Sequence, residues 1–123
     1  MSNIKIFDAE LNLMNRIWDQ PGIKAIDLAN WATETLGWKK NSTYSILKKL
    51  LDKGAVSRTD PGFVLQPLVS RDEIAMDETN DLIDKMYGGH LSMFLSAFTG
   101  SQKLSRKDKA ALQAMLDHMP HDE

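Results

Sequence analysis

Apolar residues recur at helical spacing in the first part of the chain and predict two amphipathic helices. The first is expected to start at an N-cap, Asp8, and to end before Gln20-Pro21-Gly22, a typical helix-breaking run. The second ends at Leu36, where Gly37 can take the left-handed conformation that closes a helix. The two apolar stripes are Leu11, Met14, Ile17 and Trp18, then Ala25, Leu28, Ala29, Ala32 and Leu36.

A third helix is predicted from Asn41 or Ser42, either of which could cap it, to Lys53. Its apolar face consists of Thr43, Ile46, Leu47, Leu50 and Leu51. At about 100° per residue, the opposite face carries polar side chains, with Tyr44 at its border. These polar residues are Asn41, Ser42, Ser45, Lys48 and Lys49.

A short β-hairpin is predicted next, from two β-compatible segments, 55–58 and 63–65. Thr59-Asp60-Pro61-Gly62 lies between them and is a strong turn signal, and Pro67 is expected to end strand pairing. Three helices followed by one hairpin is the order of a winged helix-turn-helix.

The rest of the chain predicts three more helices. Ser70 and Glu73 form a capping box for a helix to about Tyr87, and a short helix after Gly88-Gly89 is expected to end at Thr99-Gly100. Ser105 caps the last helix. The two final helices carry sharp apolar stripes, namely Leu91, Phe94, Leu95 and Phe98, then Leu112, Met115, Leu116 and Met119. These stripes predict either pairing with a second copy of the chain or packing onto the winged domain of the same chain.

The composition, 42% apolar and 26% charged over 123 residues, is that of a soluble globular protein. The absence of cysteine excludes disulfides, thiolate metal sites and cysteine nucleophiles. The sequence shows no nucleophile elbow, phosphate-binding loop or zinc helix, so we expect no enzyme, no cofactor and no metal. No signal peptide or membrane-spanning run is visible, and we expect a cytoplasmic protein.

Charge is unevenly distributed, although the net charge is only −2. Residues 38–58 contain six cations and one anion, Asp52, whereas residues 59–86 contain two cations and seven anions. A basic segment in an acidic chain fits either a polyanion-binding face or a solvated helix face.

The third helix has the composition of a DNA-recognition helix. Its neutral side chains could reach base edges from Ser42, Tyr44 and Ser45, while the cations around them could reach phosphates. Asn41 could pair with adenine or cap the helix, and Trp38 could pack in the core or lie against a DNA strand. The candidate phosphate-binding cations are Lys39, Lys40, Lys48, Lys49 and, in the wing, Arg58.

The segment WKKNSTYSILKKLLDKGAV, residues 38–56, resembles the helix-3 signature of the penicillinase repressor family. The resemblance extends over DAELNLMNRIW (8–18), PLVSR (67–71), YGGHLSMFLSAF (87–98) and LSRKDKAALQAML (104–116). It implies a bacterial repressor of mainly α fold, with a winged-helix DNA-binding domain at 1–70 and a helical dimerisation domain at 71–123. The resemblance also implies that the repressor is a homodimer and that this homodimer binds double-stranded, pseudo-palindromic operator DNA.

The resemblance also bears on the inducing signal. Copper-responsive members carry a C-terminal cysteine motif that is absent here, which excludes copper sensing of that kind. Antibiotic-responsive members are cleaved through a membrane sensor-protease pathway, and the matching bond here is Ala97-Phe98. The alternatives are a winged-helix repressor released by a small ligand and a winged helix that serves as a protein-interaction module.

Overall fold

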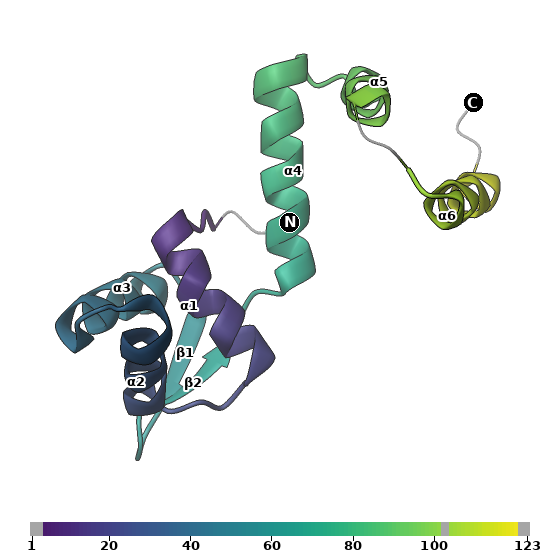
Figure 1. Cartoon of the computed structure of the whole chain (residues 1–123). Helices are drawn as coiled ribbons and strands as arrows, with labels where there is room; N and C mark the ends of the chain where they lie inside the picture. Colours follow the sequence, from purple (N-terminus) through teal and green to yellow (C-terminus); the bar gives the residue numbers. More distant parts are fainter. Residues whose placement is uncertain (1–3, 102–103, 121–123) are drawn as a thin grey trace. The chain divides into compact units, whose positions relative to one another are not determined.

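A computed structural model of the chain describes residues 4–101 and 104–120. Within these residues the fold is mainly helical, as predicted, with one antiparallel hairpin (Figure 1). The elements are α1 (Asp8–Asp19), α2 (Ala25–Leu36), α3 (Lys40–Asp52), β1 (Val56–Thr59), β2 (Val64–Pro67), α4 (Arg71–Tyr87), α5 (Leu91–Ser101) and α6 (Arg106–Asp117). The chain divides into two compact units, Met1–Thr79 and Asn80–Glu123, and the division falls inside α4.

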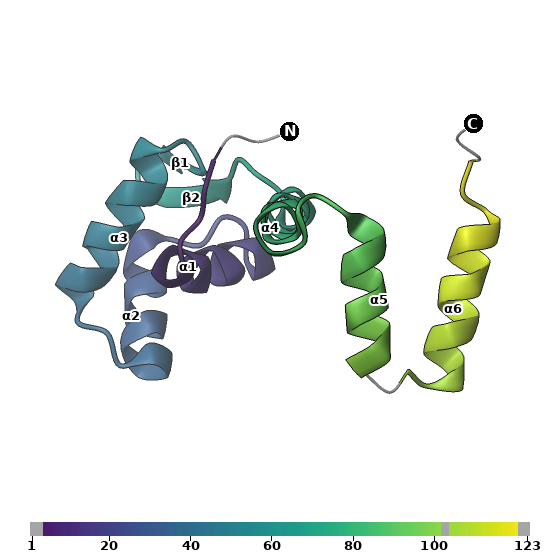
Figure 2. The same cartoon turned by 90° about the horizontal axis from the view of Figure 1, so that it is seen from above.

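The first unit is a winged helix built around one apolar core. α1 contacts α2, α3 and β2, while α3 contacts α2 and β1, and Figure 2 shows α3 at the edge of this unit beside α2. Lys24, just before α2, forms an isolated bridge to Val64 of the hairpin. The fully buried large side chains are Leu13, Met14, Ile17, Leu28, Leu47, Leu50, Leu65 and Thr43.

The core of the first unit continues into α4. The indole N–H of Trp18 donates to the carbonyl of Val69 at 2.8 Å, and Arg71 forms an ion pair with Asp19 at 2.9 Å. These contacts orient the start of α4 so that Ile74 is buried in the core. The winged-helix packing therefore includes the first turns of α4.

Four helix boundaries match the pattern of the sequence. Gly37 has φ 73° at the end of α2, and Gly88 and Gly89 both have positive φ after α4. The hydroxyls of Ser70 and Ser105 accept from the N–H groups of Glu73 and Asp108, each at 3.0 Å. These caps confirm the predicted starts of α4 and α6.

Three predicted boundaries are wrong. Phe7, not Asp8, is the N-cap of α1, because the Glu10 carboxylate accepts from the Phe7 N–H at 2.9 Å and draws Asp8 into the first turn. α3 begins at Lys40 with Lys39 as N-cap, so Asn41 and Ser42 lie inside the helix and neither caps it. α5 runs through Thr99 and Gly100 to Ser101, since the Thr99 hydroxyl donates to the carbonyl of Leu95 at 2.7 Å within the helix.

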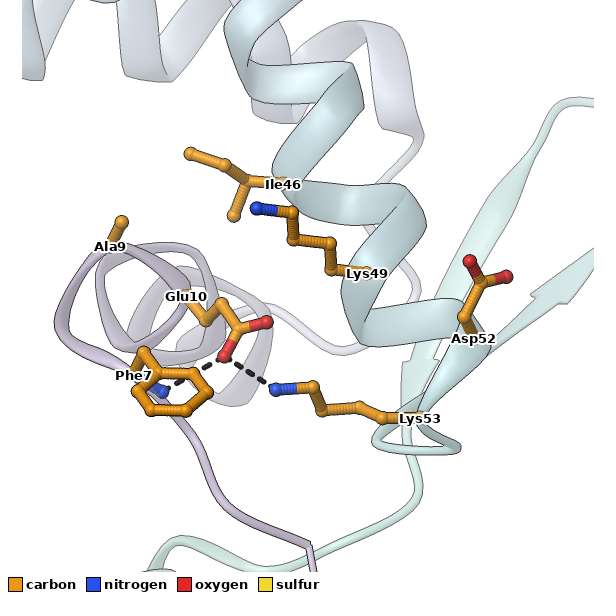
Figure 3. A pocket seen from close by; sticks show the side chains of 7 residues that line it. All are labelled: Phe7, Ala9, Glu10, Ile46, Lys49, Asp52 and Lys53. Carbon is orange, nitrogen blue, oxygen red and sulfur yellow. Dashed lines mark hydrogen bonds and ion pairs between the residues drawn. The ribbon is translucent and has the colours of Figure 1, made fainter.

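A partly buried ion pair fixes the C-terminal end of α3 to the start of α1 (Figure 3). The Lys53 ammonium lies 2.7 Å from the Glu10 carboxylate and 2.8 Å from the carbonyl of Lys5, and 4.9 Å from the centre of the Phe7 ring. The side chain of Glu10 is 5% exposed and that of Lys53 24%. Removing one partner of such a pair leaves a poorly solvated charge.

We expect Glu10→Ala to lower the free energy of unfolding by about 2–3 kcal/mol, because Lys53 and the Phe7 N–H both lose their acceptor. Urea denaturation followed by circular dichroism measures the loss. Asp8→Ala, which removes an exposed acid from the same helical turn, is the matched control and should lose only about 0.3–1 kcal/mol. Equal losses for the two variants would contradict the role given to the ion pair.

Candidate nucleic-acid interface

The buried face of α3 determines which side chains reach solvent. Thr43, Leu47 and Leu50 are buried in the core, so the residues on the opposite side are exposed. Tyr44 is half-buried at the border of the two faces. The predicted site residues exposed on α3 and at its N-cap are Lys39, Lys40, Asn41, Ser42, Ser45, Lys48 and Lys49.

The N-terminus of α3 is electropositive. Lys39 and Lys40 stand at the start of the helix, no side chain caps it, and its first turn contains no acidic residue. The partial positive charge of a helix N-terminus normally favours acids there, as found in α1, α4 and α6. Uncapped N–H groups beside two ammonium groups suit an anion such as a DNA phosphate.

Ion pairs neutralise half of the six cations counted in residues 38–58. Lys48 pairs with Asp52 at 2.9 Å along the exposed side of α3, and Lys53 pairs with Glu10. Arg58 pairs with Asp60 through two contacts, of 2.9 and 3.3 Å. Two of the three carboxylates, those of Glu10 and Asp60, lie outside the segment whose charge was counted.

Phe63 links the wing to α3 through a cation–π contact and a tilted contact between two aromatic rings. The guanidinium of Arg58 lies 3.5 Å from the centre of the Phe63 ring, and that ring lies 6.2 Å from the ring of Tyr44. Arg58 and Tyr44, both predicted site residues, are therefore brought together by Phe63. Phe63 and Asp60 were missed as site residues, although both stand in or beside the predicted turn.

Arg58 also lowers the pKa of the Asp60 carboxyl group in the turn of the wing. Its hydrogen bond to the Asp60 carboxylate holds the pKa of that group below its ordinary value. Desolvation opposes this shift, and the charge of the guanidinium and the N–H of Phe63 add to the lowering of the Asp60 pKa. The pair is therefore ionised throughout the neutral and mildly acidic range, and its contribution to stability is lost only as the pH falls through the lowered pKa.

Both predicted site serines of α3 are exposed. The Ser45 hydroxyl donates to the carbonyl of Asn41 at 3.0 Å, which leaves its oxygen able to accept. Ser42 is exposed near the start of α3.

Trp38 is half-buried against the core, which favours its packing role over contact with a DNA strand.

A pocket of about 460 Å³ lies between the start of α1 and α3 (Figure 3). Phe7, Ala9 and Glu10 line one side, and the other side consists of Ile46, Lys49, Asp52 and Lys53. Lys49 thus borders this pocket on the flank of α3 away from Tyr44. Within the described residues, no group of three or more acidic, histidine or cysteine side chains is placed to hold a metal ion.

The predicted dimerisation residues lie on α5, α6 and the residues just after α6. Phe94 is half-buried against Tyr87 and Phe98, with ring centres 5.6 and 5.8 Å apart. The other seven are between 42% and 63% exposed, namely Leu91, Leu95, Phe98, Leu112, Met115, Leu116 and Met119.

The candidate cleavage bond, Ala97-Phe98, lies within α5, and both of its residues are exposed. A protease binds its substrate in an extended conformation, so cleavage there would require α5 to unwind locally. Among the helices described, none is long and apolar enough to cross a membrane.

Comparison with known proteins gives consistent matches. The sequence profile described as penicillinase repressor matches residues 6–118. The penicillinase repressor of Bacillus licheniformis is 24% identical over 115 residues, which cover 92% of this chain and 90% of the relative.

Two solved structures resemble the winged-helix part. The DNA-binding domain of the repressor BlaI matches with a TM-score of 0.53 and 28% identity, covering 59% of this chain and 93% of that one. The monomeric form of Bacillus licheniformis BlaI in complex with the blaP half-operator matches with a TM-score of 0.53 and 27% identity, covering 58% and 90%. These matches agree with the winged helix-turn-helix expected from the sequence.

We expect Arg58→Gln to raise the pKa of Asp60 toward the ordinary aspartate value of about 3.9, because the carboxylate loses its strongest donor. The carboxyl carbon shift of Asp60, followed by NMR across an acid titration, gives the pKa directly. Lys49→Gln removes a cation from the other flank of α3 and should leave it unchanged. An identical titration in the wild type and Arg58→Gln would show that Arg58 does not hold the carboxylate.

Proposed function

The chain belongs to the penicillinase repressor family, and on that premise we propose that it represses transcription as a homodimer, with α3 of each protomer in a major groove of operator DNA. The family match and the similarity to two BlaI DNA-binding-domain structures support a DNA-binding repressor, and they speak against an enzyme. The observation that carries the proposal is the exposed polar face of α3 with its uncapped, cationic N-terminus.

The proposed contacts divide into two kinds. Lys39, Lys40 and Lys49 neutralise phosphates and supply affinity that does not depend on sequence. Asn41, Ser42 and Ser45 face the base edges, and Tyr44 lies at the border where α3 meets the wing. α3 contains no arginine, so the bidentate contact of arginine with guanine is not made from this helix.

Footprinting of the DNA upstream of the chain's own coding sequence tests the proposal. We expect a protected, pseudo-palindromic site whose two halves are one helical turn, about 34–36 Å, apart or a multiple of that distance. Salt-dependent and sequence-selective protection would reject the alternative of a protein-interaction module. The absence of any DNA binding would overturn the proposed function.

Lys40→Ala combined with Lys49→Ala, which removes two cations that have no carboxylate partner among the described residues, should weaken binding to operator and mixed-sequence DNA alike and flatten the salt dependence by about 1 to 2 units of slope. Fluorescence anisotropy over a salt series measures both quantities. Ser42→Ala is the matched control on the same face, and it should change the preference among operator variants while leaving the slope unchanged. Wild-type binding by the double lysine variant would contradict the assignment of this face.

The homodimer is proposed from the apolar faces of α5 and α6. Each contains several large side chains about half exposed in the single chain, and each such side chain gains about 1.5–3 kcal/mol when fully buried. A two-fold contact buries the same face on both protomers and gives the two recognition helices that a palindromic operator needs.

Leu95→Asp combined with Leu116→Asp should produce a monomer in analytical ultracentrifugation, because two buried charges per protomer would oppose the contact. Operator binding should weaken greatly in the same variant. Ile26→Asp, which places a charge at a comparably exposed apolar position of α2, is the control and should leave the dimer intact. A dimer that persists in the double variant would place the interface elsewhere in the chain.

A further inference from the structure

The cations of α3 and the wing fall into two groups. Lys39, Lys40 and Lys49 have no carboxylate partner among the described residues. Lys48 and Arg58 are each held by a carboxylate of the same element or the adjoining turn, Asp52 and Asp60 respectively. Figure 3 shows Asp52 at the C-terminal end of α3, pointing away from Glu10, the acid that engages Lys53.

Both ion pairs are solvent-exposed. The side chains of Lys48 and Asp52 are 75% and 65% exposed, and those of Arg58 and Asp60 are 46% and 58%. An exposed ion pair contributes little to stability, and an asparagine at position 60 keeps an oxygen that can accept from the Phe63 N–H, so neither ion pair is needed to hold the fold. Each carboxylate instead forms with its cation the kind of ion pair that a DNA phosphate would form.

We propose that Asp52 and Asp60 are specificity-determining residues, whose ion pairs with Lys48 and Arg58 stay closed on non-specific DNA and open only when α3 is seated in its operator. The inference rests on the proposed DNA-binding function and concerns the same face. A carboxylate next to a cation repels the DNA backbone and cancels the counterion release that the cation would otherwise cause.

The two kinds of complex differ in how closely α3 approaches the DNA. Non-specific binding is a long-range attraction that includes no base contacts, so a closed ion pair contributes nothing to it. In an operator, base contacts fix the position of α3, and phosphates brought within hydrogen-bond distance can replace the carboxylates as partners of Lys48 and Arg58. The two ion pairs thus lower the affinity for non-specific DNA more than the affinity for the operator.

The experiment compares Asp52→Asn, Asp60→Asn and their combination with the wild type. Affinity for the footprinted operator and for a mixed-sequence duplex of equal length is measured by fluorescence anisotropy at several salt concentrations. Each substitution should tighten mixed-sequence binding about threefold or more at low salt and steepen its slope by about 1. Operator binding should tighten less, so the ratio of the two affinities should fall.

Two controls separate this effect from charge and folding. Asp81→Asn makes the same charge change on an exposed position of α4 and should leave both affinities unchanged. Asp52→Glu keeps a carboxylate four residues after Lys48 and should behave as the wild type.

Equal tightening on both duplexes would overturn the inference, because the acids would then act only as general charge. Unchanged binding to both duplexes would overturn it as well. In either case the wild type still binds its operator, so the proposed function stands, whereas a wild type that binds no DNA at all would overturn the proposed function itself.

Discussion

The burial of Thr43, Leu47 and Leu50 is the constraint on which the candidate interface depends. These side chains seal α3 against the core formed with α1, α2 and β1, and their spacing leaves no freedom in how the helix is rotated about its axis. A rotation of one residue, about 100°, would move Leu50 to the exposed position of Lys49 and Lys48 to the buried position of Leu47. The position of every polar side chain on the outer face therefore follows from three buried side chains on the inner face.

Electrostatic contacts then determine which cations of α3 and the wing remain available to bind DNA. Glu10 uses the Lys53 ammonium to fix the end of α3 to the N-terminal segment, which removes that cation from the surface available to DNA. Phe63 supports Arg58 on one side of the helix, while Lys49 borders the pocket on the other. The basic segment thus has a cationic end at Lys39 and Lys40, without a carboxylate partner among the described residues, and a neutralised stretch at Lys48 and Asp52.

Local signals in the sequence predicted most of the fold. Apolar periodicity identified all six helices, and the capping serines and Gly37 located three of their ends, because these features depend on residues a few positions apart. Asp8 and Asn41 misled, since both helices start before them. The local bond from the Phe7 N–H to Glu10 makes Phe7 the N-cap of α1, and α3 begins at Lys40 with Lys39 as its N-cap. The partners of Lys53 and Arg58 could not be found by counting charge within a segment. Glu10 reaches Lys53 across 43 positions of sequence, and only the fold reveals that contact.

The two units also differ in how far a single chain buries their apolar side chains. The winged helix closes its own core, and side chains such as Leu13 and Leu28 have no exposed surface. In α5, by contrast, apolar residues dominate, yet the helix has no buried residue, although Phe94 contacts the ring of Phe98 and, edge to face, that of Tyr87 at the end of α4. An uncovered face of this kind is costly in water but useful in a repressor. For the proposed homodimer this face supplies the energy of assembly, and such a dimer would bind a two-fold operator with two copies of an interface whose individual ion pairs and phosphate contacts are weak.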